Sequence, residues 1–169
     1  ILKLNALDLN GHYEDTALVL RDENEPNIYL VKDLIKQLGE IKLPLMIPLY
    51  SLELRNDENS NYGLAFNLID NAELIYSPIL NENSGKFSSE DIDENGLPKK
   101  IGDGNRYFYT RKTGLSRLYL DDELYSYSDN DYLAVSDGSG RVVVIDKAGS
   151  QKFYYVKILE NHALKCVEN

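Results

Sequence analysis

The chain lacks several residue types that usually point to a site. Its 169 residues include no tryptophan, one cysteine, one methionine and two histidines. Because Cys166 has no second cysteine to pair with, an intrachain disulfide is excluded, and cysteine usage leaves the cellular compartment open. His12 and His162 lie near opposite ends, and nothing in their spacing predicts a shared metal or catalytic site. No apolar run approaches the ~20 residues that a membrane-spanning helix needs.

Sequence motifs of known catalytic sites are also missing. There is no Gly-x-Ser-x-Gly elbow, phosphate loop, dinucleotide fingerprint or zinc-ligand spacing. Glu40-Ile41-Lys42 resembles the carboxylate-x-Lys fragment of some nucleases, but the nearest upstream acid, Asp33, falls within a predicted helix instead of at a strand end. We therefore favour a protein without enzymatic activity, and keep a hydrolase built from scattered carboxylates as an alternative.

Basic residues are scarce relative to acidic ones, which gives a net charge of −10. Residues 1–80 carry −7, residues 81–104 carry −3, and residues 105–169 are neutral. Binding to a phosphate backbone requires a basic face, so direct nucleic-acid binding is disfavoured. An acidic surface keeps a protein soluble and attracts basic partners. A soluble protein with a solvated acidic surface is the simplest interpretation of this charge, and a protein partner, including a basic one, is compatible with it.

Length and composition favour one domain spanning residues 1–169, because a chain of this size can bury one proper core. Residues 81–105 form the longest non-periodic segment, rich in Ser, Asn, Gly and charge, and any boundary between two lobes is expected there. The sequence begins at Ile1 instead of Met, which indicates a processed, trimmed or excised chain. Both cytoplasmic and extracytoplasmic locations fit.

The residues that are present indicate β-structure, with short runs of β-branched and aromatic residues between turn signals. The clearest hairpin is predicted at Tyr132–Asp146, around Gly138-Ser139-Gly140. Asn10-Gly11 predicts another turn, and a further hairpin is predicted from residues 62–69 and 72–79 around Asp70-Asn71. The expected fold is mainly β, an antiparallel sandwich or a partly open barrel of short hairpin-connected strands.

One amphipathic helix is predicted at residues 30–38. Val31, Leu34, Ile35 and Leu38 follow the i, i+3, i+4, i+7 spacing of an apolar stripe. Gly39 stands where a glycine ends a helix.

An aspartate-rich stretch gives the only metal hypothesis. Asp91, Asp93, Asn95 and Gly96 match the first half of a calcium loop, in which oxygen ligands alternate and glycine permits a sharp turn. The match fails at the twelfth position, where Gly102 replaces the bidentate glutamate. We therefore treat calcium at Asp91, Asp93 and Asn95 as a weak prediction, and otherwise expect no cofactor. An acidic surface loop without metal is the alternative.

The tyrosines of the second half give the binding hypothesis. Phe108, Leu118, Leu120 and Leu124 share the strand phase that would face a core. The opposite phase carries the predicted binding residues: Tyr107, Tyr109, Arg111, Arg117, Tyr119, Tyr125 and Tyr127. Tyrosine and arginine are enriched at protein–protein hot spots, because each combines contact area with a polar end. The sequence therefore predicts a protein-interaction domain, such as an assembly subunit, an inhibitor or an immunity-type binder.

Two other readings of these tyrosines remain open. Tyrosine rings stack on sugars, so an extracellular carbohydrate-binding or calcium-binding β-module is an alternative function. The same residues also suit a half-exposed sheet face, where cross-strand pairs alone account for them.

Overall fold

The computed structural model describes residues 13–121, 123, 125–133, 140–145 and 151–154, the last two ranges by their backbone pairing. The first elements are β1 (Tyr13–Leu20), α1 (Ile28–Leu38), β2 (Leu45–Pro48), the 3-10 helix η1 (Leu49–Ser51), β3 (Leu52–Asn56), β4 (Leu64–Leu68) and β5 (Ile75–Tyr76). They are followed by the 3-10 helix η2 (Pro78–Asn81), β6 (Gly85–Phe87), β7 (Arg106–Tyr109), β8 (Leu115–Leu120), β9 (Ser126–Tyr127), β10 (Gly140–Ile145) and β11 (Gln151–Tyr154).

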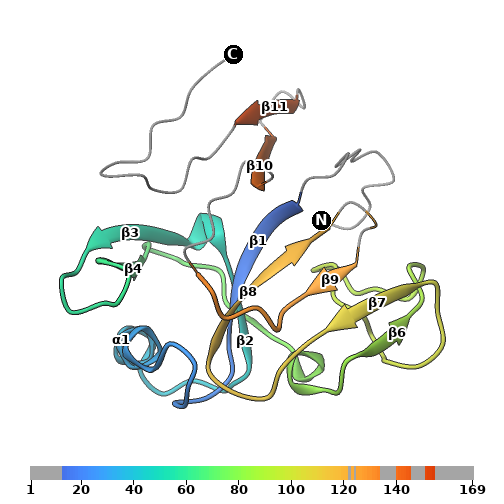
Figure 1. Cartoon of the computed structure of the whole chain (residues 1–169), viewed down its shortest axis with the longest axis horizontal. Helices are drawn as coiled ribbons and strands as arrows, with labels where there is room; N and C mark the ends of the chain where they lie inside the picture. The colour runs from blue at the N-terminus through green and yellow to red at the C-terminus, as the bar shows by residue number, and fades with distance from the viewer. Residues whose placement is uncertain (1–12, 122, 124, 134–139, 146–150, 155–169) are drawn as a thin grey trace.

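Most described strands belong to one curled sheet that forms a half-barrel (Figure 1). Its order is β11-β10-β1-β8-β9-β7-β6; outside this order, β2 also pairs with β1, and β5 pairs with β2. The β3–β4 pair forms a separate small sheet. This arrangement confirms the predicted mainly β fold with a partly open barrel.

Strand order in the sheet differs from a series of consecutive hairpins. β8 and β9 pair antiparallel, but β9 also pairs with β7, and that pair is parallel. The Arg21 amide donates to the Gly114 carbonyl at 3.0 Å, which extends the β1–β8 ladder beyond Leu20 and Leu115. The two-residue strand β9 lies between β8 and β7.

The predicted hairpin around Asp70-Asn71 is wrong. β4 pairs with β3, while β5 pairs with β2. The reason lies in burial: Ala65 of β4 packs with the helix, whereas Ile75 of β5 packs against the cluster on the other side of the sheet. β4 and β5 therefore pack against different apolar clusters, and the turn at Asn71 connects the β3–β4 sheet to the main sheet.

Several predictions fall on other parts of the chain. The Asn10-Gly11 turn and residues 134–139 of the Tyr132–Asp146 hairpin lie outside the described residues, as do His12, Leu124, His162 and Cys166. Within the described part, β10 pairs antiparallel with β11, and parallel with β1 at Tyr13 and Glu14.

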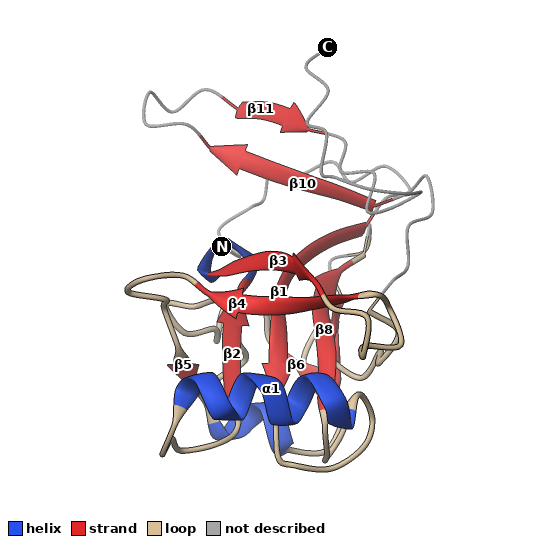
Figure 2. Cartoon of the chain, turned by 90° about the vertical axis from the view of Figure 1, so that its left-hand side faces the viewer, coloured by secondary structure: helices blue, strands red, loops and turns tan. Residues whose placement is uncertain are grey.

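The predicted helix is confirmed as α1. Leu30, Val31 and Leu34 are buried, and the Gly39 amide donates to the Ile35 carbonyl at 2.9 Å. Gly39 has φ +70°, a conformation that glycine adopts without a steric penalty. In Figure 2, α1 and the β3–β4 pair both lie in front of β1, β2 and β8, so they cover the same face of the sheet.

Apolar residues are buried on both faces of the sheet, and β1 supplies both sets in alternation. Leu18 and Leu20 face α1, while Val19 faces the opposite cluster. That opposite cluster includes Phe87 and Leu97, so the polar segment 81–105 contributes to the core. The division into one domain or two lobes stays a prediction. No helix in the described part of the chain is long and apolar enough to cross a membrane.

A buried arginine joins the ends of several strands. Arg21 is only 2% exposed, and its guanidinium donates to the Leu80 carbonyl at 3.0 Å, to Ser116 Oγ at 2.8 Å and to the Ser128 carbonyl at 2.7 Å. Burial, aided by Arg111, lowers the pKa of Arg21. Because the acceptors are neutral, hydrogen bonding instead of ion pairing offsets much of the cost of burying this charge.

Candidate functional site: a tyrosine ladder

Strand register brings tyrosines from four strands into one row. Tyr127 of β9 lies directly opposite Tyr119 of β8 and also opposite Tyr109 of β7. Tyr107 is two residues from Tyr109 and therefore shares its face. On the other side, Tyr13 of β1 contacts Tyr119. We call this row the tyrosine ladder: Tyr107, Tyr109, Tyr127, Tyr119 and Tyr13.

The rings of the ladder are packed against one another. Tyr109 and Tyr127 have centroids 4.5 Å apart and an interplanar angle of 8°, and Tyr127 and Tyr119 lie 4.9 Å apart at 6°. Tyr107 lies 4.4 Å from Tyr109 at a tilt of 35°, and Tyr13 meets Tyr119 edge-on at 5.6 Å. The faces of the Tyr109 and Tyr127 rings are therefore covered by neighbouring rings, and their edges and hydroxyl groups are directed outward.

The ladder continues the sheet face that the helix covers. Tyr119 shares its side of β8 with Leu115, which is fully buried in the cluster beneath α1. The ladder then extends over β9 and β7, away from α1 and the β3–β4 pair (Figure 1). Its tyrosines are half-buried. The core phase predicted from the sequence is confirmed at Phe108, Leu118 and Leu120, which are buried on the opposite face.

Arg117 lies on the predicted face, but its side chain is buried. It is 7% exposed, and its Nη1 atom lies 3.2 Å from Asp15 Oδ2. Its guanidinium carbon is 4.8 Å from the Tyr119 ring centroid and 5.3 Å from that of Tyr13. Arg117 therefore occupies the β1 end of the ladder as a cation held by two rings and one carboxylate.

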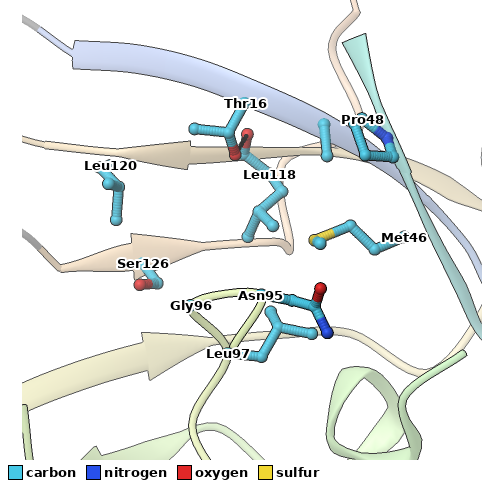
Figure 3. A pocket seen from close by; sticks show the side chains of 10 residues that line it. Thr16, Met46, Pro48, Asn95, Gly96, Leu97, Leu118, Leu120 and Ser126 are labelled. Atoms are coloured by element: carbon cyan, nitrogen blue, oxygen red, sulfur yellow. Dashed lines mark hydrogen bonds between the residues drawn. The ribbon is translucent and has the colours of Figure 1, made fainter. Parts of the chain in front are cut away.

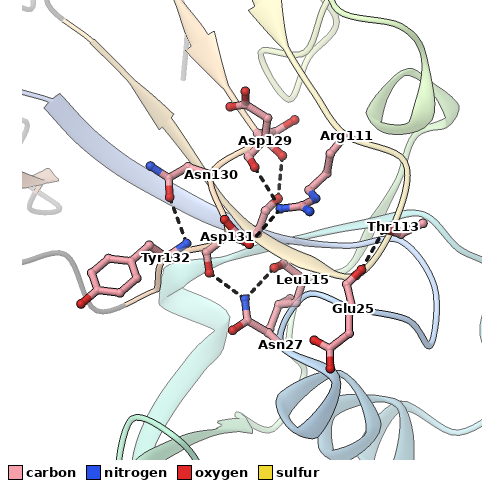
Figure 4. A network of polar contacts seen from close by, with 12 residues as sticks. Glu25, Asn27, Arg111, Thr113, Leu115, Asp129, Asn130, Asp131 and Tyr132 are labelled. Atoms are coloured by element: carbon pink, nitrogen blue, oxygen red, sulfur yellow. Dashed lines mark hydrogen bonds and ion pairs between the residues drawn. The ribbon is translucent and has the colours of Figure 1, made fainter.

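Arg111 belongs to a different set of contacts, in the turn between β7 and β8. Its Nη1 atom donates to the Asp129 carbonyl at 3.1 Å and lies 3.5 Å from Asp131 Oδ2. Figure 4 shows this network, in which Asn27 also donates to the carbonyls of Leu115 and Asp131, at 2.9 and 2.7 Å. The contacts join the helix entry to the strands, and Arg111 is not part of the aromatic stack.

Two carboxylates, Asp121 and Glu123, lie close to Tyr125 and Tyr127. Asp121 accepts a hydrogen bond from the Tyr127 hydroxyl, and its Oδ1 atom accepts the Tyr125 amide at 2.8 Å. Burial, followed by the Asp121 hydrogen bond, raises the pKa of Tyr127. The charge of the exposed Glu123 is the largest cause that raises the pKa of Tyr125. Asp121 and Glu123 therefore bring negative charge close to Tyr125 and Tyr127.

The aspartates of the calcium hypothesis are engaged in other contacts. Asp93 Oδ1 accepts the amides of Asn95 and Leu97, each at 2.9 Å. Asp91 lies 3.5 Å from Lys100 Nζ and 3.9 Å from Lys99 Nζ. Among the described residues, no group of three or more His, Cys, Asp or Glu side chains is placed to hold a metal. Calcium binding stays an untested prediction.

Two other features could in principle form a site: a second pair of carboxylates and a small apolar recess. Arg55 bridges Asp33 at 2.8 Å and Asp57 at 2.7 Å, and Tyr29 donates to Asp57 at 2.9 Å, so this group ties α1 to β3. On the opposite face of the sheet from the ladder, Met46, Leu97 and their neighbours line an apolar recess (Figure 3). The recess has room for about one water molecule, which is too small for an organic ligand.

Sequence reasoning placed four ladder tyrosines on one face but missed Tyr13. No local signal connects Tyr13 with Tyr119, because β1 and β8 pair across about a hundred residues of chain. No protein-family model, curated protein or solved structure matches this chain.

Proposed function

We propose that this chain is a non-enzymatic protein-interaction domain and that the tyrosine ladder is its contact surface. The observation that carries the proposal is a row of stacked, half-buried tyrosines on a part of the sheet face that α1 and the β3–β4 pair leave uncovered. Tyrosine supplies contact area at a low cost in conformational entropy, and its hydroxyl adds a hydrogen bond. Cross-strand stacking holds the rings in place before a partner arrives, which lowers the entropic cost of binding.

Ring orientation favours a protein partner over a carbohydrate. A sugar stacks on an exposed ring face, but the faces of Tyr109 and Tyr127 are already packed against neighbouring rings. Ring edges and hydroxyl groups suit the varied side chains and backbone groups of a protein surface.

The carboxylates also favour binding over the hydrolase alternative. Arg55 holds the carboxylates of Asp33 and Asp57, and Arg117 holds that of Asp15, an arrangement typical of structural ion pairs.

The proposal is tested by comparing what three immobilised proteins retain from an extract of the source organism. The ladder variant carries Tyr107→Ala, at the β7 end of the ladder, and Tyr125→Ala, two residues before the ladder residue Tyr127. Tyr107 makes one described ring contact and Tyr125 makes none, so folding is expected to be preserved. The control variant carries Tyr50→Ala and Tyr132→Ala, which remove two tyrosines that are 62% and 59% exposed elsewhere.

A genuine partner is retained by the wild type and the control and lost by the ladder variant. With the purified partner, the ladder variant should weaken binding by about 2 kcal/mol, or roughly thirtyfold, if the two tyrosines are hot spots. Equal retention of every protein by the wild type and the ladder variant contradicts the proposal, provided that both variants melt near the wild-type temperature.

A further inference from the structure

The outer edge of β3 presents backbone groups that no described residue pairs. On its inner edge, β3 pairs with β4: the Asp57 amide donates to the Gly63 carbonyl at 3.0 Å, and the Ile69 amide donates to the Ser51 carbonyl at 3.1 Å. Hydrogen-bonded pairs alternate along an antiparallel ladder, so every second residue between these two pairs points its backbone groups the other way. Three residues of β3 therefore direct their backbone groups away from β4: Leu52, Leu54 and Asn56.

Most of these outward backbone groups are open to an incoming strand. The Leu52 amide is already used, because it donates to the Leu49 carbonyl. The Leu52 carbonyl, both backbone groups of Leu54 and the Asn56 amide have no partner among the described residues. Leu54 is 38% exposed, and Asn56 is exposed as well. β3 therefore offers donors and acceptors in alternation along an accessible edge, with an apolar side chain at its centre.

Two other edge strands are closed by the chain itself. β4 lies between β3 and α1 (Figure 2), and the Gln37 side chain of α1 donates to the Phe66 carbonyl at 2.8 Å and accepts the Leu68 amide at 2.9 Å. At the outer edge of β6, the Gly102 amide donates to the Lys86 carbonyl at 2.8 Å. Proteins usually cover such edges, because an open edge pairs with other chains. The edge of β3 is left open where those of β4 and β6 are covered.

Carboxylates predominate beside this open edge. Glu53 is exposed, has no described ion pair, and shares a face of β3 with Arg55. The Arg55 guanidinium is already shared by Asp33 at 2.8 Å and Asp57 at 2.7 Å. Three carboxylates and one guanidinium leave an excess of two negative charges. A basic segment is attracted to this charge, whereas a second copy of the chain, with its net charge of −10, brings more charge of the same sign.

We propose that the outer edge of β3 binds an extended, basic segment of another protein as an added strand, with an apolar residue opposite Leu54 and a lysine or arginine opposite Glu53. Backbone hydrogen bonds supply the affinity in such strand addition, and alternate side chains supply the specificity. This surface lies outside the tyrosine ladder, so the inference does not depend on the proposed function.

The test uses three blocked nine-residue peptides and the ¹⁵N-labelled full chain. The first peptide alternates valine with lysine, the second alternates valine with glutamate, and the third is the valine–lysine peptide with N-methyl groups on its valines. N-methylation keeps the side chains and charges but removes the amide donors of one peptide edge. We expect the valine–lysine peptide to shift the amide signals of Leu54 and Asn56 and to slow their hydrogen exchange. The Gly102 amide, which is already bonded, should stay unchanged.

The other two peptides decide between the possible outcomes. We expect neither to shift Leu54 or Asn56. Equal shifts from the methylated peptide overturn the inference, because binding then needs charge but no added strand. Equal shifts from the glutamate peptide overturn the preference for a basic segment. Self-association of the wild type through the same amides, without any peptide, shows that the edge binds a second copy instead.

Variants of β3 separate the backbone from the charge. Leu54→Pro removes an outward donor that β4 does not use, so the β3–β4 pairing should survive while the valine–lysine peptide is lost. Glu53→Gln leaves the backbone intact and should weaken binding by about two- to fivefold, the range of one exposed charge pair. Glu90→Gln removes an exposed glutamate beyond β6 and should bind like the wild type. Unchanged binding in both β3 variants contradicts the inference.

The two proposals fail separately. The variant with Tyr107→Ala and Tyr125→Ala should bind the valine–lysine peptide like the wild type, because it leaves β3 intact. Loss of the peptide in that variant places binding on the ladder and overturns the inference about β3. Loss in Leu54→Pro alone supports the β3 edge, whatever the capture experiment shows for the ladder.

Discussion

The rings of Tyr119 and Tyr127 lie 4.9 Å apart and within 6° of parallel, on strands that pair directly. Such cross-strand aromatic pairs contribute about 0.5–1.5 kcal/mol beyond the burial of their surface. The same contact fixes the orientation of both rings, so the stacking that stabilises the fold also holds the ladder in position.

A double-mutant cycle measures this contact. Tyr119→Leu and Tyr127→Leu keep most of the apolar volume but remove the aromatic pair. We expect a coupling free energy of about 0.5–1.5 kcal/mol between them in urea unfolding. Tyr29→Leu, on α1, provides the reference and should be additive with Tyr127→Leu within about 0.5 kcal/mol. Additivity of the Tyr119 and Tyr127 changes contradicts a cooperative ladder.

Alkaline pH should destabilise the fold through the tyrosines. Burial raises the pKa of Tyr119 and Tyr127, and the charge of Glu123 raises that of Tyr125. Since these groups hold their protons more tightly when folded, their stabilisation is complete below the unfolded value of ~10 and is lost as pH rises through the folded pKa values.

Tyrosinate absorbance measures this directly, because no tryptophan obscures the signal. We expect part of the tyrosines to ionise near pH ~10 and the rest at higher pH, together with unfolding. A single ionisation step near pH ~10 with the fold intact would count against buried ladder rings.

Arg21 should contribute strongly to the free energy of unfolding. Arg21→Met keeps an apolar stem of similar reach but leaves Ser116, Ser128 and the Leu80 carbonyl without their donor. We expect a loss of about 3–5 kcal/mol in the free energy of unfolding. Arg55→Met removes a more exposed guanidinium, so it should lower the free energy of unfolding much less than Arg21→Met does. Similar losses for the two variants would show that Arg21 is not the central polar contact.

Calcium should leave the thermal stability unchanged. The Asp93 carboxylate already accepts two amides, and two lysines lie close to Asp91, so a cation would have to displace existing partners. We expect the same melting temperature in millimolar calcium and in chelator. A rise with calcium that Asp91→Asn abolishes would establish a metal site through linkage.

Local patterns predicted the parts of the fold that depend on neighbours in sequence. The i, i+3, i+4, i+7 stripe and Gly39 predicted α1, and strand alternation separated Phe108, Leu118 and Leu120 from the tyrosines. These signals work because helix and strand periodicity determine which side chains share a face.

Long-range pairing could not be predicted in the same way. Tyr13 joins the ladder because β1 pairs with β8. No local pattern indicates that β9 lies between β7 and β8 and pairs with both. Arg21 is a charged residue and Leu97 lies in a polar segment, yet both are buried. The tertiary fold supplies hydrogen-bond acceptors for Arg21 and an apolar cluster for Leu97.

Chemical labelling of tyrosines tests the contact surface most directly. Tyrosine side chains are modified in the free protein and in the partner complex, and the modified sites are counted by mass spectrometry. We expect Tyr107, Tyr125 and Tyr127 to become protected in the complex, while Tyr50, Tyr76 and Tyr132 react equally in both states. Protection of those three reference residues with unchanged labelling of the ladder would contradict the proposed contact surface.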